Sequence, residues 1–113
     1  MDIRRVFREG RRVEAGPLML HARRRGADEK LPPGARVGIA AARRFPSAVA
    51  RNRARRITRE AARILLRESR DPWDLVLVVR PGVLERSVRE RADCVADLLR
   101  RAGVISASTV AAP

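Results

Sequence analysis

The residues of this chain that could carry out covalent chemistry are few and scattered. The sequence has one cysteine, Cys94, one histidine, His21, and one close acidic pair, Asp71 and Asp74, in a predicted turn. A nucleophile would need an adjacent base, and a metal-dependent nuclease would need further carboxylates beside that pair. Cys94 lies in an apolar helical pattern, which indicates a packing role. We therefore expect no catalytic residues and no metal site in the protein itself.

Arginine is the functional group that the sequence supplies in quantity. The chain has 113 residues with 26 Lys+Arg against 13 Asp+Glu, a net charge of +13. Such a charge repels itself in a folded protein and is usually neutralised by a polyanion, so nucleic acid is the first partner to consider. Gly34 and Gly38 do not have the spacing of a nucleotide phosphate loop. We expect a nucleic-acid partner and no small-molecule substrate.

The positive charge is concentrated in the middle of the chain. Residues 43–70 carry ten Arg and two Glu, a net charge of +8, whereas residues 71–113 are neutral. Ser47 can N-cap a helix that begins at Ala48, and no proline interrupts the pattern before Pro72. The sequence therefore predicts a helix that carries much of the charge.

One side of this helix is apolar and the other is basic. On a helical wheel an apolar stripe faces the core, and the opposite side is almost wholly basic, with Arg51 and Arg53 flanking the stripe. The stripe contains Ala50, Ala54, Ile57, Ala61, Ile64 and Leu65, and the opposite side contains Asn52, Arg55, Arg56, Arg59, Arg63, Arg67 and Arg70. Solvated charged faces normally mix both signs, whereas only Glu60 and Glu68 interrupt this one. We interpret the basic side as a polyanion-binding surface.

The strands that must position this helix lie on both sides of it in the sequence. Alternating apolar residues predict a strand over residues 18–22, and small side chains predict a second strand over residues 36–42. A hairpin-type loop over residues 23–34 joins the two. The unbroken aliphatic run over residues 75–79 follows a turn over residues 71–74 and predicts a buried strand at or near the centre of the sheet.

The remaining pattern completes one small domain. Apolar residues recur at helical spacing from Val83 to Ala102, and Gly103 is the expected stop. The predicted fold is α+β, a two-layer sandwich with helices packed on a mixed β-sheet. Residues 1–105 would form a single nucleic-acid-binding domain, and residues 106–113 a disordered tail. No stretch is long enough to span a membrane and no signal peptide is recognisable, so we expect a cytoplasmic protein.

The basic helix carries a specific motif. Arg51-Asn52-Arg53, followed by Arg55, Arg56, Arg59 and Glu60, resembles the pattern RNR-x-(K/R)-R-x-x-R-E of the bacterial ribonuclease P protein component. Three other segments also resemble this family, and the similarity covers roughly residues 3–103. They are the strand that ends in Arg43 and Arg44, the apolar strand that ends in Arg80, and the element at residues 6–10.

This resemblance implies the protein subunit of a ribonucleoprotein endonuclease. In that family an RNA subunit carries out Mg²⁺-dependent hydrolysis that removes the 5′ leader from precursor tRNA, and Mg²⁺ is held mainly by RNA. The protein would bind the RNA subunit and the leader. The resemblance also implies a left-handed β-α-β crossover through the Arg-rich helix, although such crossovers are nearly always right-handed.

The resemblance also implies which residues bind RNA. The signature helix would face the RNA subunit and border a leader cleft formed with the sheet. Arginine suits both contacts, because it binds phosphate oxygens bidentately without reading bases. The helix residues are Arg51, Asn52, Arg53, Arg55, Arg56, Arg59 and Arg63, and the cleft residues are Phe7, His21, Arg43 and Arg44.

Two cleft positions depart from the family pattern. Ile3 stands at the family's earlier aromatic position, and His21 at a sheet position that is often Tyr or Phe. For Phe7 the alternative to leader contact is core packing, and for His21 it is a half-buried strand histidine. The chain also begins almost at the first aromatic position, so we expect a first helix that is short or absent.

Two other functions compete with this interpretation. Composition alone would favour a structural RNA-binding protein, such as a small ribosomal protein, which binds rRNA without affecting tRNA processing. A self-contained metal-dependent nuclease would depend on Asp71 or Asp74.

Overall fold

The computed structural model describes residues 1–29, 33–67 and 69–106. Its strands form a four-stranded sheet in the order β1-β2-β4-β3, in which β3 and β4 are parallel and the other neighbours antiparallel. This confirms the predicted α+β class with a mixed sheet. The elements are α1 (Ile3–Glu9), β1 (Arg11–Ala15), β2 (Leu18–Arg24), β3 (Arg36–Ala41), α2 (Ala48–Leu65), β4 (Trp73–Val79), the 3₁₀ helix η1 (Pro81–Glu85) and α3 (Val88–Arg101).

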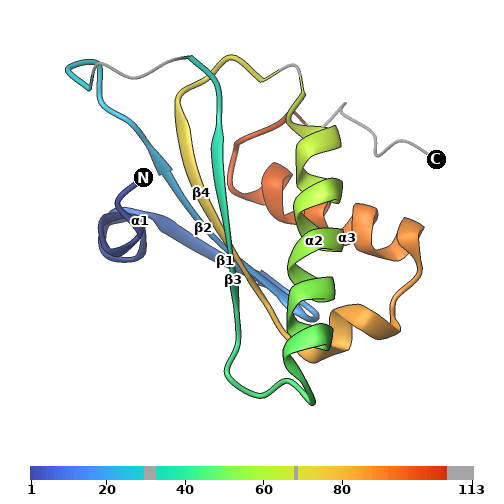
Figure 1. Cartoon of the computed structure of the whole chain (residues 1–113). Coiled ribbons are helices and arrows are strands. Elements are labelled where there is room, and N and C mark those ends of the chain that lie inside the picture. Colours follow the sequence, from blue (N-terminus) through green and yellow to red (C-terminus); the bar gives the residue numbers. More distant parts are fainter. Residues whose placement is uncertain (30–32, 68, 107–113) are drawn as a thin grey trace.

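Helices lie on both sides of the sheet. Figure 1 shows α2 and α3 against one face and α1 against the other. The alternation of β2 explains the division, because Leu18, Leu20 and Ala22 join the core under α2 and α3, whereas His21 and Arg23 point to the α1 side. The sheet therefore has a core face and an outer face, and α1 covers part of the outer face.

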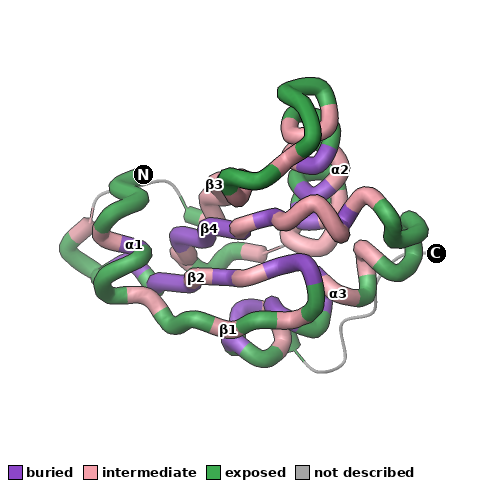
Figure 2. Tube along the Cα trace, turned by 90° about the horizontal axis from the view of Figure 1, so that it is seen from below, coloured by how far each residue is buried: buried purple, intermediate pink, exposed green. Residues whose placement is uncertain are grey.

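The helix α2 is the connection between two parallel neighbours. β3 pairs with β4 from Arg36 opposite Asp74 to Ala41 opposite Val79, and α2 packs mainly over β3. β4 lies between β2 and β3, as its aliphatic run predicted, and the buried positions follow β2 and β4 (Figure 2). The left hand of this crossover stays a prediction.

The edge strand β1 was not predicted from the sequence. Its residues are mostly exposed, and only Val13 and Ala15 pack against the core. An edge strand that is hydrogen-bonded to a single neighbour needs no continuous apolar run, so its sequence resembles a loop. The two-residue turn Gly16-Pro17 joins it to β2, with Gly16 at a φ of 53° that an L side chain rarely adopts.

Several predicted boundaries were wrong by a few residues. The last helix is broken in two, because Ser87 and Glu90 form a capping box that starts α3 afresh after η1. Strand β2 continues into the predicted loop as far as Arg24, and β4 begins within the predicted turn, at Trp73. Gly103 stops α3 with a φ of 80°, as expected.

The prediction for the N-terminal end can be compared with the structure, whereas most of the predicted tail cannot. The first helix is short, as predicted, with seven residues in α1. The predicted disordered tail, residues 106–113, lies outside the described residues except for Ser106.

Candidate nucleic-acid interface

The helix α2 is built by local signals that the sequence contains. The Ser47 Oγ accepts a hydrogen bond of 3.0 Å from the Ala50 N–H and caps the first turn. The helix has 18 residues, which corresponds to a length of about 27 Å. Six of these residues are Arg and one is Glu, so α2 presents a long and strongly positive rod.

The side of α2 that faces the core differs from the predicted stripe. Ala54, Thr58 and Ala62 are buried, whereas Ile64 is 38% exposed. The buried side is rotated by about 70° from the predicted stripe on a helical wheel. The reason is tertiary, because α2 packs against η1 and α3 as well as the sheet, and small side chains fit that crowded side.

This rotation changes the position of some predicted RNA-binding residues. Arg51 and Arg55 are half-buried, and the Arg55 Nε is buried without a hydrogen-bond partner among the described residues. The prediction that Arg55 lies on the side opposite the core was therefore wrong. Asn52, Arg53, Arg56, Arg59 and Arg63 are exposed. Fewer residues of the signature motif are exposed than the sequence predicted, but guanidinium groups still dominate the exposed side of α2.

The arginines of α2 largely lack carboxylate partners. Within the described part of the chain only Arg63 forms an ion pair from this helix, with Glu60 at 2.6 Å. Arginines elsewhere behave differently: Arg12, Arg23, Arg36 and most of the others in α1, the sheet and α3 contact a carboxylate or a backbone carbonyl. The α2 guanidinium groups thus keep their hydrogen-bonding capacity for an external anion.

Arg43 and Arg44 extend this basic surface. Both are exposed in the segment between β3 and the N-cap of α2, while Phe45 after them packs against the core. Because Phe45 anchors the segment, the two arginines stay close to the first turn of α2.

Phe7 and His21 come together on the outer face of the sheet. Their ring centroids are 4.6 Å apart in an edge-to-face arrangement with an interplanar angle of 82°. Phe7 remains 42% exposed and His21 is half-buried. Burial lowers the pKa of His21 and the charge of Arg12 lowers it further, and both favour the neutral imidazole. The pair forms an exposed aromatic platform, and Phe7 is not a core residue.

The structure places the helix residues and the aromatic platform in different layers. The core face carries α2 and the outer face carries α1 (Figure 1). The Phe7–His21 pair lies on the outer face, because Phe7 belongs to α1. Two separate surfaces result: a guanidinium surface on α2, extended by Arg43 and Arg44, and an aromatic platform.

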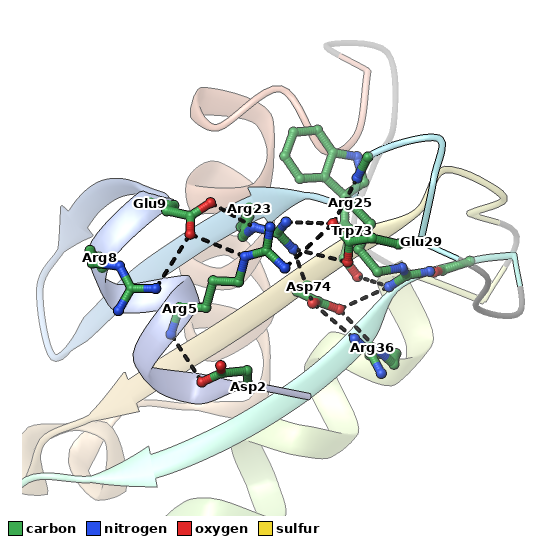
Figure 3. Close-up of polar contacts among 12 residues, drawn as sticks. Asp2, Arg5, Arg8, Glu9, Arg23, Arg25, Glu29, Arg36, Trp73 and Asp74 are labelled. Carbon is green, nitrogen blue, oxygen red and sulfur yellow. Dashed lines mark hydrogen bonds and ion pairs between the residues drawn. The ribbon is translucent and has the colours of Figure 1, made fainter.

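An ionic cluster on the outer face was not predicted from the sequence (Figure 3). Asp74, expected to be a turn residue, is 2% exposed within β4 and accepts hydrogen bonds from Arg36 at 2.8 and 2.9 Å and from Arg25 at 2.9 Å. Burial opposes ionisation of Asp74, but these hydrogen bonds outweigh it and lower its pKa. No local signal marks this cluster, because its members meet through the strand register.

The other candidate residues do not assemble into a reactive site. Asp71 is exposed beside Arg24, whereas the Asp74 oxygens are bound by arginines, so the two carboxylates do not face a common site. The Cys94 thiol contacts the Ala15 carbonyl at 3.2 Å, and burial raises its pKa. Across the described ranges, no three metal-ligating side chains gather and no helix could cross a bilayer.

Comparisons with known proteins agree on one family. The Ribonuclease P family model matches residues 1–103. The ribonuclease P protein component of Roseiflexus castenholzii is 39% identical, over 96% of this chain and 86% of that protein. The protein of the same name from Symbiobacterium thermophilum is 34% identical, over 88% and 84%.

Solved structures show the same fold. The RNase P protein of Staphylococcus aureus superposes with a TM-score of 0.74 at 19% identity, over 93% of this chain and 92% of that one. The RNase P protein of Thermotoga maritima does so with a TM-score of 0.74 at 25% identity, over 88% and 90%.

Proposed function

The chain belongs to the ribonuclease P protein family, and we propose that it acts as the protein subunit of the ribonuclease P endoribonuclease. In this role it binds the RNA subunit and the 5′ leader of precursor tRNA in the cytoplasm. It promotes Mg²⁺-dependent removal of the leader, which gives the mature tRNA 5′ end. The RNA carries the chemistry, and the protein contributes binding.

The row of arginines on α2 carries this proposal. Arg53, Arg56 and Arg59 are exposed and have no carboxylate partner among the described residues, so an RNA backbone can supply their acceptors. A rod of about 27 Å that presents these groups at helical spacing follows phosphates without reading bases. Contacts to phosphates alone suit a folded RNA that is recognised by the shape of its backbone.

The aromatic platform supports leader binding. Single-stranded RNA is commonly held by stacking of bases on aromatic side chains beside basic groups. Phe7 is 42% exposed. Arg8, next to Phe7 in the sequence, and Arg12, opposite His21 in the strand register, are exposed as well. Because α2 lies on the other face of the sheet, one molecule can hold two RNA segments at once.

The residues present do not fit a Mg²⁺ site within the protein. The part of the chain that the structure describes contains no group of three candidate ligands, and the buried Asp74 carboxylate is bound by Arg25 and Arg36. We therefore assign Mg²⁺ to the RNA phosphates, where it would activate the attacking water. The protein side chains contribute only to RNA binding and orientation.

A reconstitution experiment tests the proposal. Purified protein is mixed with a bacterial ribonuclease P RNA and leader-bearing precursor tRNA at low Mg²⁺, beside RNA alone and protein alone. Leader release only in the complete mixture supports the subunit role. If the mixture is no better than RNA alone although the protein shifts RNA in a gel, the ribosomal-type function replaces it. Cleavage by the protein alone that is lost in Asp71→Asn would establish a nuclease.

A further inference from the structure

The helix α1 depends on docking for its stability and for the place of Phe7. It has seven residues, and helices this short do not persist in water on their own. Val6 is its one buried residue. The orientation of α1 on the sheet must therefore come from a small number of contacts, and these contacts decide where the Phe7 ring lies.

Most contacts of α1 are at its C-terminal half, and from the other half Arg5 lies 3.9 Å from Glu29. Besides Val6 and the Phe7–His21 ring pair, the Glu9 carboxylate accepts a hydrogen bond of 3.4 Å from the Nε of Arg23 in β2. Gly10 follows directly, and a Cβ there would collide with the backbone oxygens of Val6 and Ala22. The end of α1 thus approaches β2 closely, and the ion pair between Glu9 and Arg23 spans the junction.

Arg23 is a rigid partner for Glu9. Its side chain is 9% exposed, and its guanidinium donates to Glu29 at 2.5 and 3.3 Å and lies 3.8 Å from Asp74. Figure 3 shows Arg23 between the carboxylates of α1, the segment after β2, and β4. Because the planar guanidinium is held on three sides, it cannot follow a movement of α1.

We propose that Arg23, acting through Glu9, is a positioning residue that orients α1 and holds the Phe7 ring against His21 for single-stranded RNA. The ion pair fixes the rotation of α1 about the buried Val6. This rotation also sets the position of the Phe7 ring, because Phe7 is two residues before Glu9 in the same helix. This inference rests on the proposed leader binding at Phe7, and it adds Glu9 and Arg23 to the residues that determine leader affinity.

A spectroscopic test reads the Phe7 position without RNA. His21 is the single histidine of the chain, so its imidazole protons give one set of NMR signals, shifted by the ring current of Phe7. Phe7→Leu defines the signal of an imidazole without that ring. In Glu9→Ala the His21 signals should move at least half of the way to the Phe7→Leu position.

The matched control is Asp93→Ala on α3. Glu9 and Asp93 are both exposed, each forms an i,i+4 ion pair with an arginine of its own helix, and each substitution raises the net charge by one. The control should leave the His21 signals unchanged. Arg23→Lys is a second variant that keeps the charge and removes the planar fork, and it should move the His21 signals as Glu9→Ala does.

A binding measurement then tests whether the position of the Phe7 ring affects leader recognition. With each holoenzyme, the affinity for leader-bearing precursor tRNA is divided by the affinity for mature tRNA. This ratio should fall by about 3- to 10-fold in Glu9→Ala relative to Asp93→Ala, because part of the stacking on Phe7 is lost.

The outcomes separate the inference from the proposed function. If wild type discriminates between the two tRNAs and Glu9→Ala discriminates equally, with unmoved His21 signals, the remaining contacts of α1 place the helix without Glu9 and the inference is overturned. If wild type itself shows no preference for the leader, the proposed leader site fails, and the inference fails with it. In that case the His21 signals still show whether Glu9 orients α1.

Discussion

The exposed arginines of α2 allow a quantitative prediction about RNA binding. We consider the triple substitution of Arg53, Arg56 and Arg59 to Gln, which removes three exposed charges that have no carboxylate partner among the described residues. Gln has nearly the helix propensity of Arg, and none of the three side chains is buried, so the fold should be unchanged. The variant therefore isolates electrostatic binding from folding.

The magnitude follows from counterion release. Each phosphate contact contributes about 0.7 to 0.9 to the magnitude of the slope of log affinity against log salt. If each Arg neutralises one phosphate, the triple variant should reduce the magnitude of this slope by about 2 to 3. Taking the electrostatic contribution as zero at 1 M salt, the triple variant should bind the RNA subunit roughly 1,000-fold more weakly at 50 mM. The same arithmetic gives a loss of about 50-fold at 200 mM.

The assay is gel-shift or filter binding to a bacterial ribonuclease P RNA over a series of KCl concentrations at fixed low Mg²⁺. The control is the triple substitution of Arg89, Arg91 and Arg101 to Gln on α3, which removes the same charge from arginines that contact Asp93, the Arg86 carbonyl or the Glu14 carbonyl. An unchanged slope in the α2 variant, or an equal fall in the control, would refute the assignment of α2 as the RNA surface. Far-UV CD of both variants checks folding.

Four further predictions concern the other parts of the structure. In Phe7→Ala, affinity for leader-bearing precursor tRNA should fall by about 5- to 100-fold while assembly with the RNA subunit is spared, and an equal loss for mature tRNA would contradict stacking of the leader on Phe7. Asp74→Asn should destabilise the fold by about 3 kcal/mol in urea unfolding, because Arg25 loses a buried partner, and a loss under 1 kcal/mol would contradict this. The hydrogen bonds from Arg23 and Gly26 lower the pKa of Glu29 to about 2. The contribution of Glu29 to stability is therefore complete above pH 4.5 and is lost as the pH falls toward 2. In Glu29→Gln, the urea concentration at the midpoint of unfolding should depend less on pH over that range. Thr58→Val should leave stability unchanged or raise it by about 1 kcal/mol, because the buried Thr58 Oγ1 has no hydrogen-bond partner among the described residues, and a clear loss of stability would contradict this.

Several features of the site were predictable because they depend on local interactions. The start of α2 follows from the Ser47 cap, and the inner position of β4 follows from a run of Leu and Val that only a covered strand can bury. The break before α3 was equally local. The capping box of Ser87 and Glu90 is a motif within four residues, so the sequence itself contains the signal that divides the last helix.

The sequence by itself thus determined which segment carries the positive charge, that this segment is helical, and which family its motif belongs to. Capping, periodicity and charge spacing act over three or four residues, and they do not depend on what packs nearby. Tertiary structure decided the rotation of α2 about its axis, because η1 and α3 pack against the side of α2 that contains Thr58 and two buried alanines.

Tertiary structure also decided the environment of Asp74 and the contact between Phe7 and His21. The hydrogen bonds from Arg36 and Arg25 to Asp74 join residues 38 and 49 positions apart, and the Phe7–His21 contact depends on how α1 docks. Such contacts follow from strand register and helix orientation, which are set by the packing of the whole sheet, and no pattern of neighbouring residues contains that information.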